Sequence, residues 1–120
     1  MNKIFLICPV RNADQTIPKL IVEALEAIGH TVYYPARDTN QDDDTGFNIC
    51  ASNRSAMRRA DEVHVFWDGE SQGCLFDMGM AFAMNKVVKI VRAPARTEGK
   101  SFQNMLFEWQ DLPPTEDNND

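Results

Sequence analysis

Cysteine is scarce in this 120-residue sequence, and the placement of its three residues argues against several classes of protein. Cys8, Cys50 and Cys74 are far apart and odd in number, and no two of them have the spacing of metal ligands. We therefore expect a reduced, cytoplasmic protein whose thiols are small core residues, with no metal site and no disulfide framework.

Long apolar runs and an excess of positive charge are also missing. No stretch approaches the roughly 20 apolar residues that span a bilayer, and the amino terminus lacks the pattern of an export signal. The formal net charge is −6 at pH 7, whereas proteins that bind nucleic acid present clustered basic surfaces. The sequence therefore predicts a soluble protein that binds neither membranes nor nucleic acid polymers.

The usual cofactor motifs are absent as well. No glycine-rich dinucleotide fingerprint follows the first apolar run, and there is no P-loop, nucleophile elbow or Cys-x-x-Cys pair. Three consecutive aspartates at positions 42 to 44 lack the alternating spacing and closing glutamate of a calcium loop. The sequence therefore predicts no cofactor.

What the sequence contains is an alternation of strand and helix patterns. Apolar or β-branched runs predict strands at residues 3–8, 31–34, 62–67 and 87–91. Apolar residues at helical spacing predict helices at 17–28 with Thr16 as the N-cap, 48–60, 73–84 and 101–110. This order predicts an α/β single-domain, flavodoxin-like or Rossmann-like three-layer fold with a parallel sheet of four to five strands. The domain is expected to span residues 1–112, followed by a disordered acidic tail at 113–120.

Asp77 is the anomaly of the sequence. It lies within the helix expected at 73–84, which is otherwise nearly all apolar, and no basic residue stands three or four positions away. A buried, unpaired carboxylate is costly. Asp77 therefore either accepts hydrogen bonds from a neighbouring loop, or serves as a functional carboxylate at the sheet edge where α/β folds bind ligands.

Other polar residues are expected at the same edge of the sheet. Arg11 follows the first strand and either binds a phosphate or carboxylate or is a solvated loop residue. Residues 35–47 form a long polar loop, a common place for ligand contacts, and Asp38 and Phe47 are its candidates.

Three motifs together carry a resemblance to a known family. They are Pro9-Val-Arg-Asn12 after the first strand, Ala60-Asp61 before the third, and Ser71-x-Gly73-x-x-x-Asp77-x-Gly79-x-Ala81. Over residues 3–91 the sequence resembles the nucleoside 2-deoxyribosyltransferase-like superfamily, which includes deoxynucleoside 5′-monophosphate N-glycosidases and CMP hydrolases.

The resemblance implies an enzyme that breaks or transfers an N-glycosidic bond. In that family a carboxylate on the third helix attacks the anomeric carbon while the base departs with proton assistance, a retaining glycosyl transfer. By this resemblance Asp77 is the nucleophile. Asp68, or alternatively Asp38, is expected to assist it by transferring a proton. Substrate contacts are implied for Pro9, Arg11, Asn53, Ser71 and Gly73, with a 5′-phosphate placed near the amides of Gly73 opposite Arg11.

Two residues depart from the family pattern. The family nucleophile is a glutamate, so Asp77 is one methylene shorter, and Asn53 stands where the family commonly has an aspartate. An amide cannot act as a general acid or base at neutral pH. The alternative function is therefore a non-catalytic sensor or sequestering protein that binds a nucleotide or an ADP-ribose-like ligand in the same crevice.

The helix at 73–84 also bears on assembly. Its apolar side chains exceed what one sheet face can cover, so they either pack in the core or form the interface of a homodimer or higher homo-oligomer. A homodimer agrees with the resemblance, since the family's active sites are completed by a neighbouring subunit.

Overall fold

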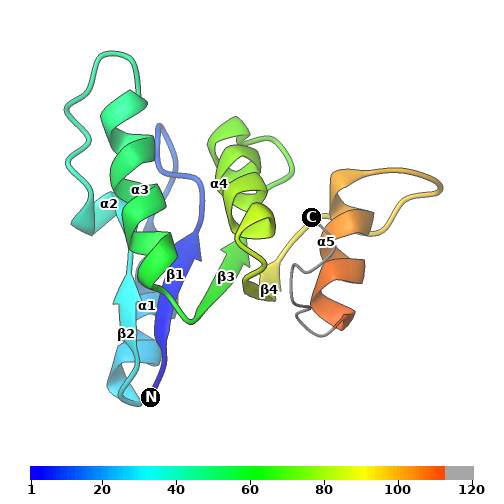
Figure 1. Ribbon diagram of the computed structural model, residues 1–120, viewed down its shortest axis with the longest axis horizontal. Coiled ribbons are helices and arrows are strands. Elements are labelled where there is room, and N and C mark those ends of the chain that lie inside the picture. Colours follow the sequence, from blue (N-terminus) through cyan, green and yellow to red (C-terminus); the bar gives the residue numbers. More distant parts are fainter. Residues whose placement is uncertain (113–120) are drawn as a thin grey trace.

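The computed structural model, which describes residues 1–112, is built on one parallel sheet (Figure 1). Its strands are β1 (Lys3–Ile7), β2 (Thr31–Tyr33), β3 (Glu62–Phe66) and β4 (Val87–Arg92), in the spatial order β2-β1-β3-β4. All three strand pairs are parallel. The predicted flavodoxin-like α/β fold is therefore confirmed, with four strands. The predicted disorder of residues 113–120 lies outside the described residues.

Helices cover both faces of the sheet because the central strand is apolar on both sides. Ile4 and Leu6 of β1 pack with Val22 of α1 (Thr16–Ala27) on one face. Phe5 and Ile7 point to the other face, which is covered by α3 (Phe47–Arg59) and α4 (Gln72–Ala83). This alternation makes three layers, as the continuous apolar run at residues 3–8 predicts for a central parallel strand.

The last helix, α5 (Phe102–Asp111), closes the α4 side of the sheet next to β4. Leu106 is fully buried in the same cluster as the α3 and α4 core residues. Trp109 packs edge-on against Phe82 of α4, and its indole N–H donates to the carbonyl oxygen of Lys86 at 3.1 Å. These contacts fix α5 to both α4 and the start of β4.

The structure corrects two local predictions. Thr16 is the first residue of α1 rather than its cap, because the Asp14 carboxylate accepts hydrogen bonds from both the Thr16 N–H and hydroxyl, at 2.9 and 2.7 Å. The polar loop predicted at 35–47 begins with a one-turn helix, α2 (Pro35–Asp38). Pro35 favours the first helical turn and the Asp38 carboxylate accepts the Tyr34 N–H at 2.8 Å, so the loop shortens to 39–46.

The helices of residues 1–112 were compared with the length and hydropathy of membrane-spanning helices. None of them has the length and apolar character needed to cross a bilayer.

Candidate active site

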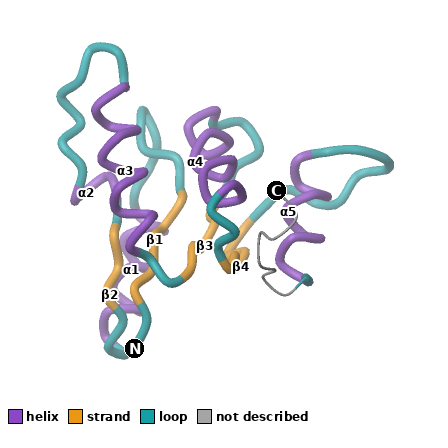
Figure 2. Tube along the Cα trace, in the orientation of Figure 1, coloured by secondary structure: helices purple, strands orange, loops and turns teal. Residues whose placement is uncertain are grey.

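A cavity of about 980 Å³ opens at the carboxyl ends of β1 and β3. Figure 2 shows that the loops after these strands and the loop before α3 lie at the same end of the sheet. Parallel sheets bind ligands at this edge, and the volume suits a small organic molecule. Of the nine predicted site residues, the cavity brings together Pro9, Arg11, Asn53, Asp68, Ser71, Gly73 and Asp77.

The other two predicted contact residues lie elsewhere. Asp38 ends α2, where its carboxylate accepts the Tyr34 N–H and pairs with Arg37. Phe47 opens α3 with its side chain 60% exposed, in a neighbouring apolar cleft that includes Phe76. The unexpected helix α2 explains the placement of Asp38, because it turns this residue back onto the chain that precedes it.

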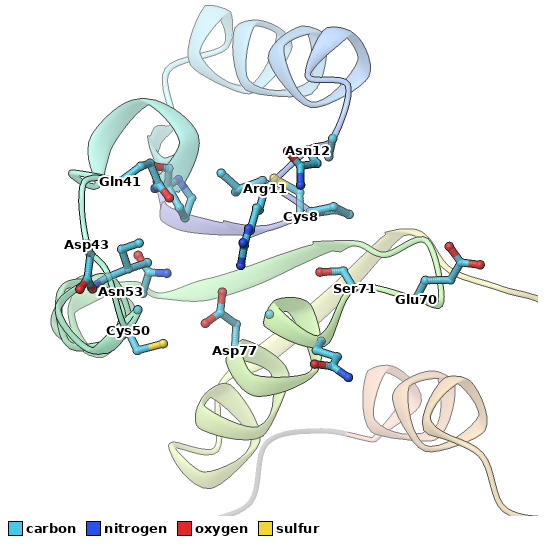
Figure 3. A pocket seen from close by; sticks show the side chains of 18 of the residues that line it. Cys8, Arg11, Asn12, Gln41, Asp43, Cys50, Asn53, Glu70, Ser71 and Asp77 are labelled. Carbon is cyan, nitrogen blue, oxygen red and sulfur yellow. The ribbon is translucent and has the colours of Figure 1, made fainter.

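Asp77 lies in the second turn of α4 and faces the cavity (Figure 3). Burial raises the pKa of its carboxyl from 3.8 to about 7, while the side-chain amide of Asn53 acts in the opposite direction. A carboxyl with this pKa is partly protonated and partly ionised at neutral pH. Such a group is able to act as a nucleophile or to exchange a proton near physiological pH.

The cavity is also lined by two cysteines that were expected to be core residues. Cys8 immediately follows β1, and Cys50 stands one helical turn before Asn53 on α3. Burial raises the pKa of both thiols, that of Cys8 to about 12, and the negative charge of Asp77 raises it further. Both thiols are therefore neutral at pH 7. The three-residue spacing of Cys50 and Asn53 is the sequence signal that was available for this placement.

Asp68 and Ser71 build the loop that leads into α4. The Asp68 carboxylate accepts the N–H groups of Glu70 and Ser71 at 2.9 and 2.8 Å, and the Ser71 hydroxyl oxygen accepts the Cys74 N–H at 3.3 Å. Partial burial raises the pKa of Asp68, but the two N–H donors outweigh it and lower the pKa overall. Asp68 is therefore ionised at neutral pH, and in this state its carboxylate accepts protons rather than donating them.

Gly69 allows this loop to form. Its φ is +84°, and an added Cβ would approach the Pro94 side chain to 2.6 Å. Only glycine combines this backbone angle with so close a neighbour. The Asp68-Gly69 pair thus ends β3 and turns the chain toward the cavity.

Arg11 lies across the cavity from α4. Its side chain extends from the loop after β1 toward Asp77 (Figure 3). Within residues 1–112 no ion pair joins Arg11 to Asp77. The guanidinium is exposed and keeps its donors available for an anionic or polar ligand.

Asp43, from the aspartate run at 42–44, has a structural role at the cavity wall. Its carboxylate accepts the Ile49 N–H at 3.0 Å and the Thr45 N–H at 3.3 Å, at the beginning of α3. These contacts hold the loop before α3 in place. In the described part of the chain, no three His, Cys, Asp or Glu side chains converge in an arrangement that could hold a metal ion.

Solved structures with the same fold include two nucleoside-processing enzymes. The 2-deoxyribosyltransferase of Bacillus psychrosaccharolyticus is 22% identical, with a TM-score of 0.61 over 73% of this chain and 70% of that chain. The CMP N-glycosidase of Clostridium botulinum is 20% identical, with a TM-score of 0.53 over 73% of this chain and 69% of that chain. At these identities the likeness establishes the fold. Among curated proteins, none matches the sequence significantly.

The sequence itself matches a family model over nearly all of the described residues. The model is that of nucleoside 2-deoxyribosyltransferase, and the match spans residues 4–111. It overlaps every element from β1 to α5 and includes every residue of the cavity. This chain therefore belongs to the nucleoside 2-deoxyribosyltransferase family.

Proposed function

We propose that this protein cleaves or transfers the N-glycosidic bond of a nucleoside or nucleoside 5′-monophosphate, with Asp77 as nucleophile. The observation that carries the proposal is a carboxylate with a raised pKa, facing a ligand-sized cavity at the carboxyl edge of the sheet. Membership of the nucleoside 2-deoxyribosyltransferase family supports the same class of reaction.

The proposed reaction has two steps. In the first, an oxygen of ionised Asp77 bonds to the anomeric carbon, the bond from that carbon to the base nitrogen breaks, and the base departs with a proton from solvent. In the second, water or another base attacks the same carbon and releases Asp77. We assign to Asp68 the acceptance of a proton from the attacking water in this second step, because its carboxylate lines the same cavity and is ionised. Its lowered pKa makes it a weak base, so this assistance contributes less than the attack by Asp77.

Release of free base is the direct test of this function. The purified protein is incubated with a panel of ribo- and deoxyribonucleosides and their 5′-monophosphates, and free base is measured by chromatography. A second panel adds a different free base as acceptor, so that transfer is distinguished from hydrolysis. Release from at least one substrate is expected, and its absence from every member would contradict the proposal.

The alternative is a protein that binds a nucleotide or an ADP-ribose-like ligand without cleaving it. The observation that favours it is Asn53, because the side chain that faces Asp77 from α3 is an amide, which cannot transfer a proton at neutral pH. A ligand that raises the melting temperature while no base is released would support this alternative, since preferential binding stabilises the folded state.

Arg11 provides a test of whether the substrate carries a phosphate. Removing a charge-assisted hydrogen bond costs about 1.5–3 kcal/mol. We therefore expect Arg11→Gln to raise KM for a 5′-monophosphate by roughly 10- to 100-fold and to change KM for the matching nucleoside little. Arg59→Gln, an exposed arginine that does not line the cavity, is the matched control. An equal change for both substrates would show that Arg11 does not contact a phosphate.

We also propose that a second copy of this chain covers the apolar cleft beside the cavity. Phe47, Phe76 and Met80 line this cleft, and the two phenylalanines are about 60% exposed. The cleft shares Thr45, Gly46 and Cys50 with the active-site cavity. A subunit packed here would therefore also close one wall of the active site.

The dimer proposal predicts the effect of a charge in the cleft. Phe76→Asp is expected to convert the dimer to a monomer in sedimentation, because an ionised carboxylate cannot be buried in an apolar interface without a partner. Phe102→Asp on α5 is the matched control, since its side chain is equally exposed at 59% but lies outside the cleft. A monomeric unmodified protein, or dimers that persist in Phe76→Asp, would contradict the proposal.

A further inference from the structure

Thr39 is a buried polar residue that lies behind the active-site cavity rather than on its wall. It follows α2 and is 6% exposed. Its hydroxyl donates a hydrogen bond to the side-chain oxygen of Asn53 at 2.8 Å, and this bond is buried. Asn53 is itself only 5% exposed. A loop residue is thus joined to the α3 side chain that faces Asp77.

Tyr33 also contacts the hydroxyl of Thr39. Its hydroxyl oxygen lies 2.7 Å from the Thr39 hydroxyl oxygen. The single proton of Thr39 is used toward Asn53, so Tyr33 is the donor to Thr39 at this shorter distance, and it shares its proton with the Asp38 carbonyl oxygen at 3.3 Å. The ring of Tyr33 stacks on Phe5 of the central strand, with ring centroids 5.5 Å apart. The chain of hydrogen bonds therefore starts from a side chain anchored on the sheet.

The orientation of the Asn53 amide follows from these contacts. Because the amide oxygen accepts from Thr39, the NH2 group is the part left to face Asp77, and the Asn53 side chain lowers the pKa of that carboxyl, as a hydrogen-bond donor does. A flipped amide would place its oxygen against the carboxylate and leave the Thr39 hydroxyl without an acceptor. Both effects disfavour the flip.

Few other groups can take over this role. The charged or titratable side chains around Asp77 come from β1, α3, α4 and the nearby loops. They are Cys8, Arg11, Asp43, Asp44, Cys50, Asp68, Glu70 and Cys74. Burial keeps the three thiols protonated at neutral pH. Arg11 makes no ion pair with Asp77, and Asp68 is an anion. Asn53 is therefore the donor with a fixed orientation at this carboxylate.

We propose that Thr39 is a positioning residue, which holds the Asn53 amide so that its NH2 group donates to Asp77 and fixes the carboxylate in one orientation. The catalytic consequence rests on the function proposed above for Asp77. The structural consequence, a fixed donor at Asp77, does not depend on that function.

The test compares Thr39→Val, which keeps the shape but removes the hydroxyl, with Thr39→Ser, which keeps the hydroxyl. The pKa of Asp77 is read from its carboxyl carbon by NMR, without substrate. A carboxylate that loses a donor becomes harder to ionise, so Thr39→Val is expected to raise this pKa by roughly half a unit to one unit. Thr39→Ser is expected to leave it unchanged. The same Asp77 pKa in the valine and serine variants would overturn the proposal.

A double-mutant cycle separates positioning from general loss of packing. In an Asn53→Ala background there is no amide to position, so Thr39→Val is expected to produce no further change in the Asp77 pKa. A shift of the same size in both backgrounds would contradict the proposal. Thr39→Ala gives a second measure if the valine variant does not fold, because it also removes the hydroxyl that donates to Asn53 and is expected to shift the pKa in the same direction.

Activity gives a separate readout. With a substrate identified by base release, Thr39→Val is expected to lower kcat by roughly tenfold with little change in KM. The acidic limb of the pH profile of kcat is expected to shift to higher pH by the same amount as the Asp77 pKa. A pKa shift in a protein that releases no base would support positioning while contradicting the proposed function. Base release with an unshifted pKa would do the reverse.

Discussion

Replacing Asp77 with asparagine is expected to lower the rate of base release by roughly a thousandfold or more. The amide of asparagine has almost no nucleophilicity toward the anomeric carbon, so the covalent step is lost. Asparagine has nearly the same size as aspartate, so the shape of the cavity is retained and substrate is still bound. The rate is measured by chromatography under single-turnover conditions, which report the chemical step rather than product release.

The matched control for this prediction is Asp42→Asn. This substitution makes the same chemical change at an exposed residue that does not line the cavity, and the variant is expected to retain full activity. Mass spectrometry of the denatured protein during turnover provides an independent check, because a glycosyl adduct should appear on the peptide that contains Asp77. If Asp77→Asn retains activity within tenfold, another group is the nucleophile.

The same substitution is expected to stabilise the folded protein at pH 8. Folding raises the pKa of Asp77 from 3.8 to about 7, because the ionised carboxylate is less well solvated in the cavity than in the unfolded chain. Asparagine removes this unfavourable charge. Each unit of pKa corresponds to about 1.4 kcal/mol, and after allowance for solvent in the open cavity we expect a gain of about 1–3 kcal/mol.

The sign of the effect gives a characteristic pH dependence. Below about pH 4 Asp77 is protonated in both states, so asparagine offers little advantage. Between about pH 4 and 7 the unfolded chain ionises while the folded protein resists, so the unmodified protein loses stability relative to the variant. Well above pH 7, where Asp77 is ionised in both states, the difference is constant. Urea unfolding of both proteins at pH 4, 6 and 8 measures it.

This prediction also decides between the two sequence-based hypotheses for Asp77. If Asp77 were a structural acceptor of loop hydrogen bonds, Asp77→Asn would destabilise the protein at pH 8 instead. Asp68→Asn is the control for that behaviour, since Asp68 accepts two backbone N–H groups and its pKa is lowered. We expect Asp68→Asn to give no stabilisation at pH 8. A site that gains stability when its carboxylate is neutralised is typical of a residue kept for function.

Much of the fold was predictable because local sequence determines each element. Within the apolar run predicted as a strand at residues 3–8, residues 4–7 are buried in β1. The boundaries of α2 were missed, because they depend on a hydrogen bond from Tyr34 to Asp38 rather than on apolar spacing. Periodicity does not report side-chain contacts of this kind.

The sequence by itself determined the class of fold, the edge of the sheet that holds the cavity, and the anomaly of Asp77 in an apolar helix. These follow from local patterns, since apolar spacing predicts the strands and helices and parallel strands end at one edge. Only the tertiary structure decided that Asn53 faces Asp77, that Thr39, which Tyr33 contacts, orients its amide, and that Asp38 and Phe47 lie outside the cavity. Residues 33, 39, 53 and 77 come from four separate segments, and the strand order and the packing of α3 beside α4 bring them together. No local sequence pattern predicts that these residues lie close together, because their proximity depends on how whole elements pack against one another.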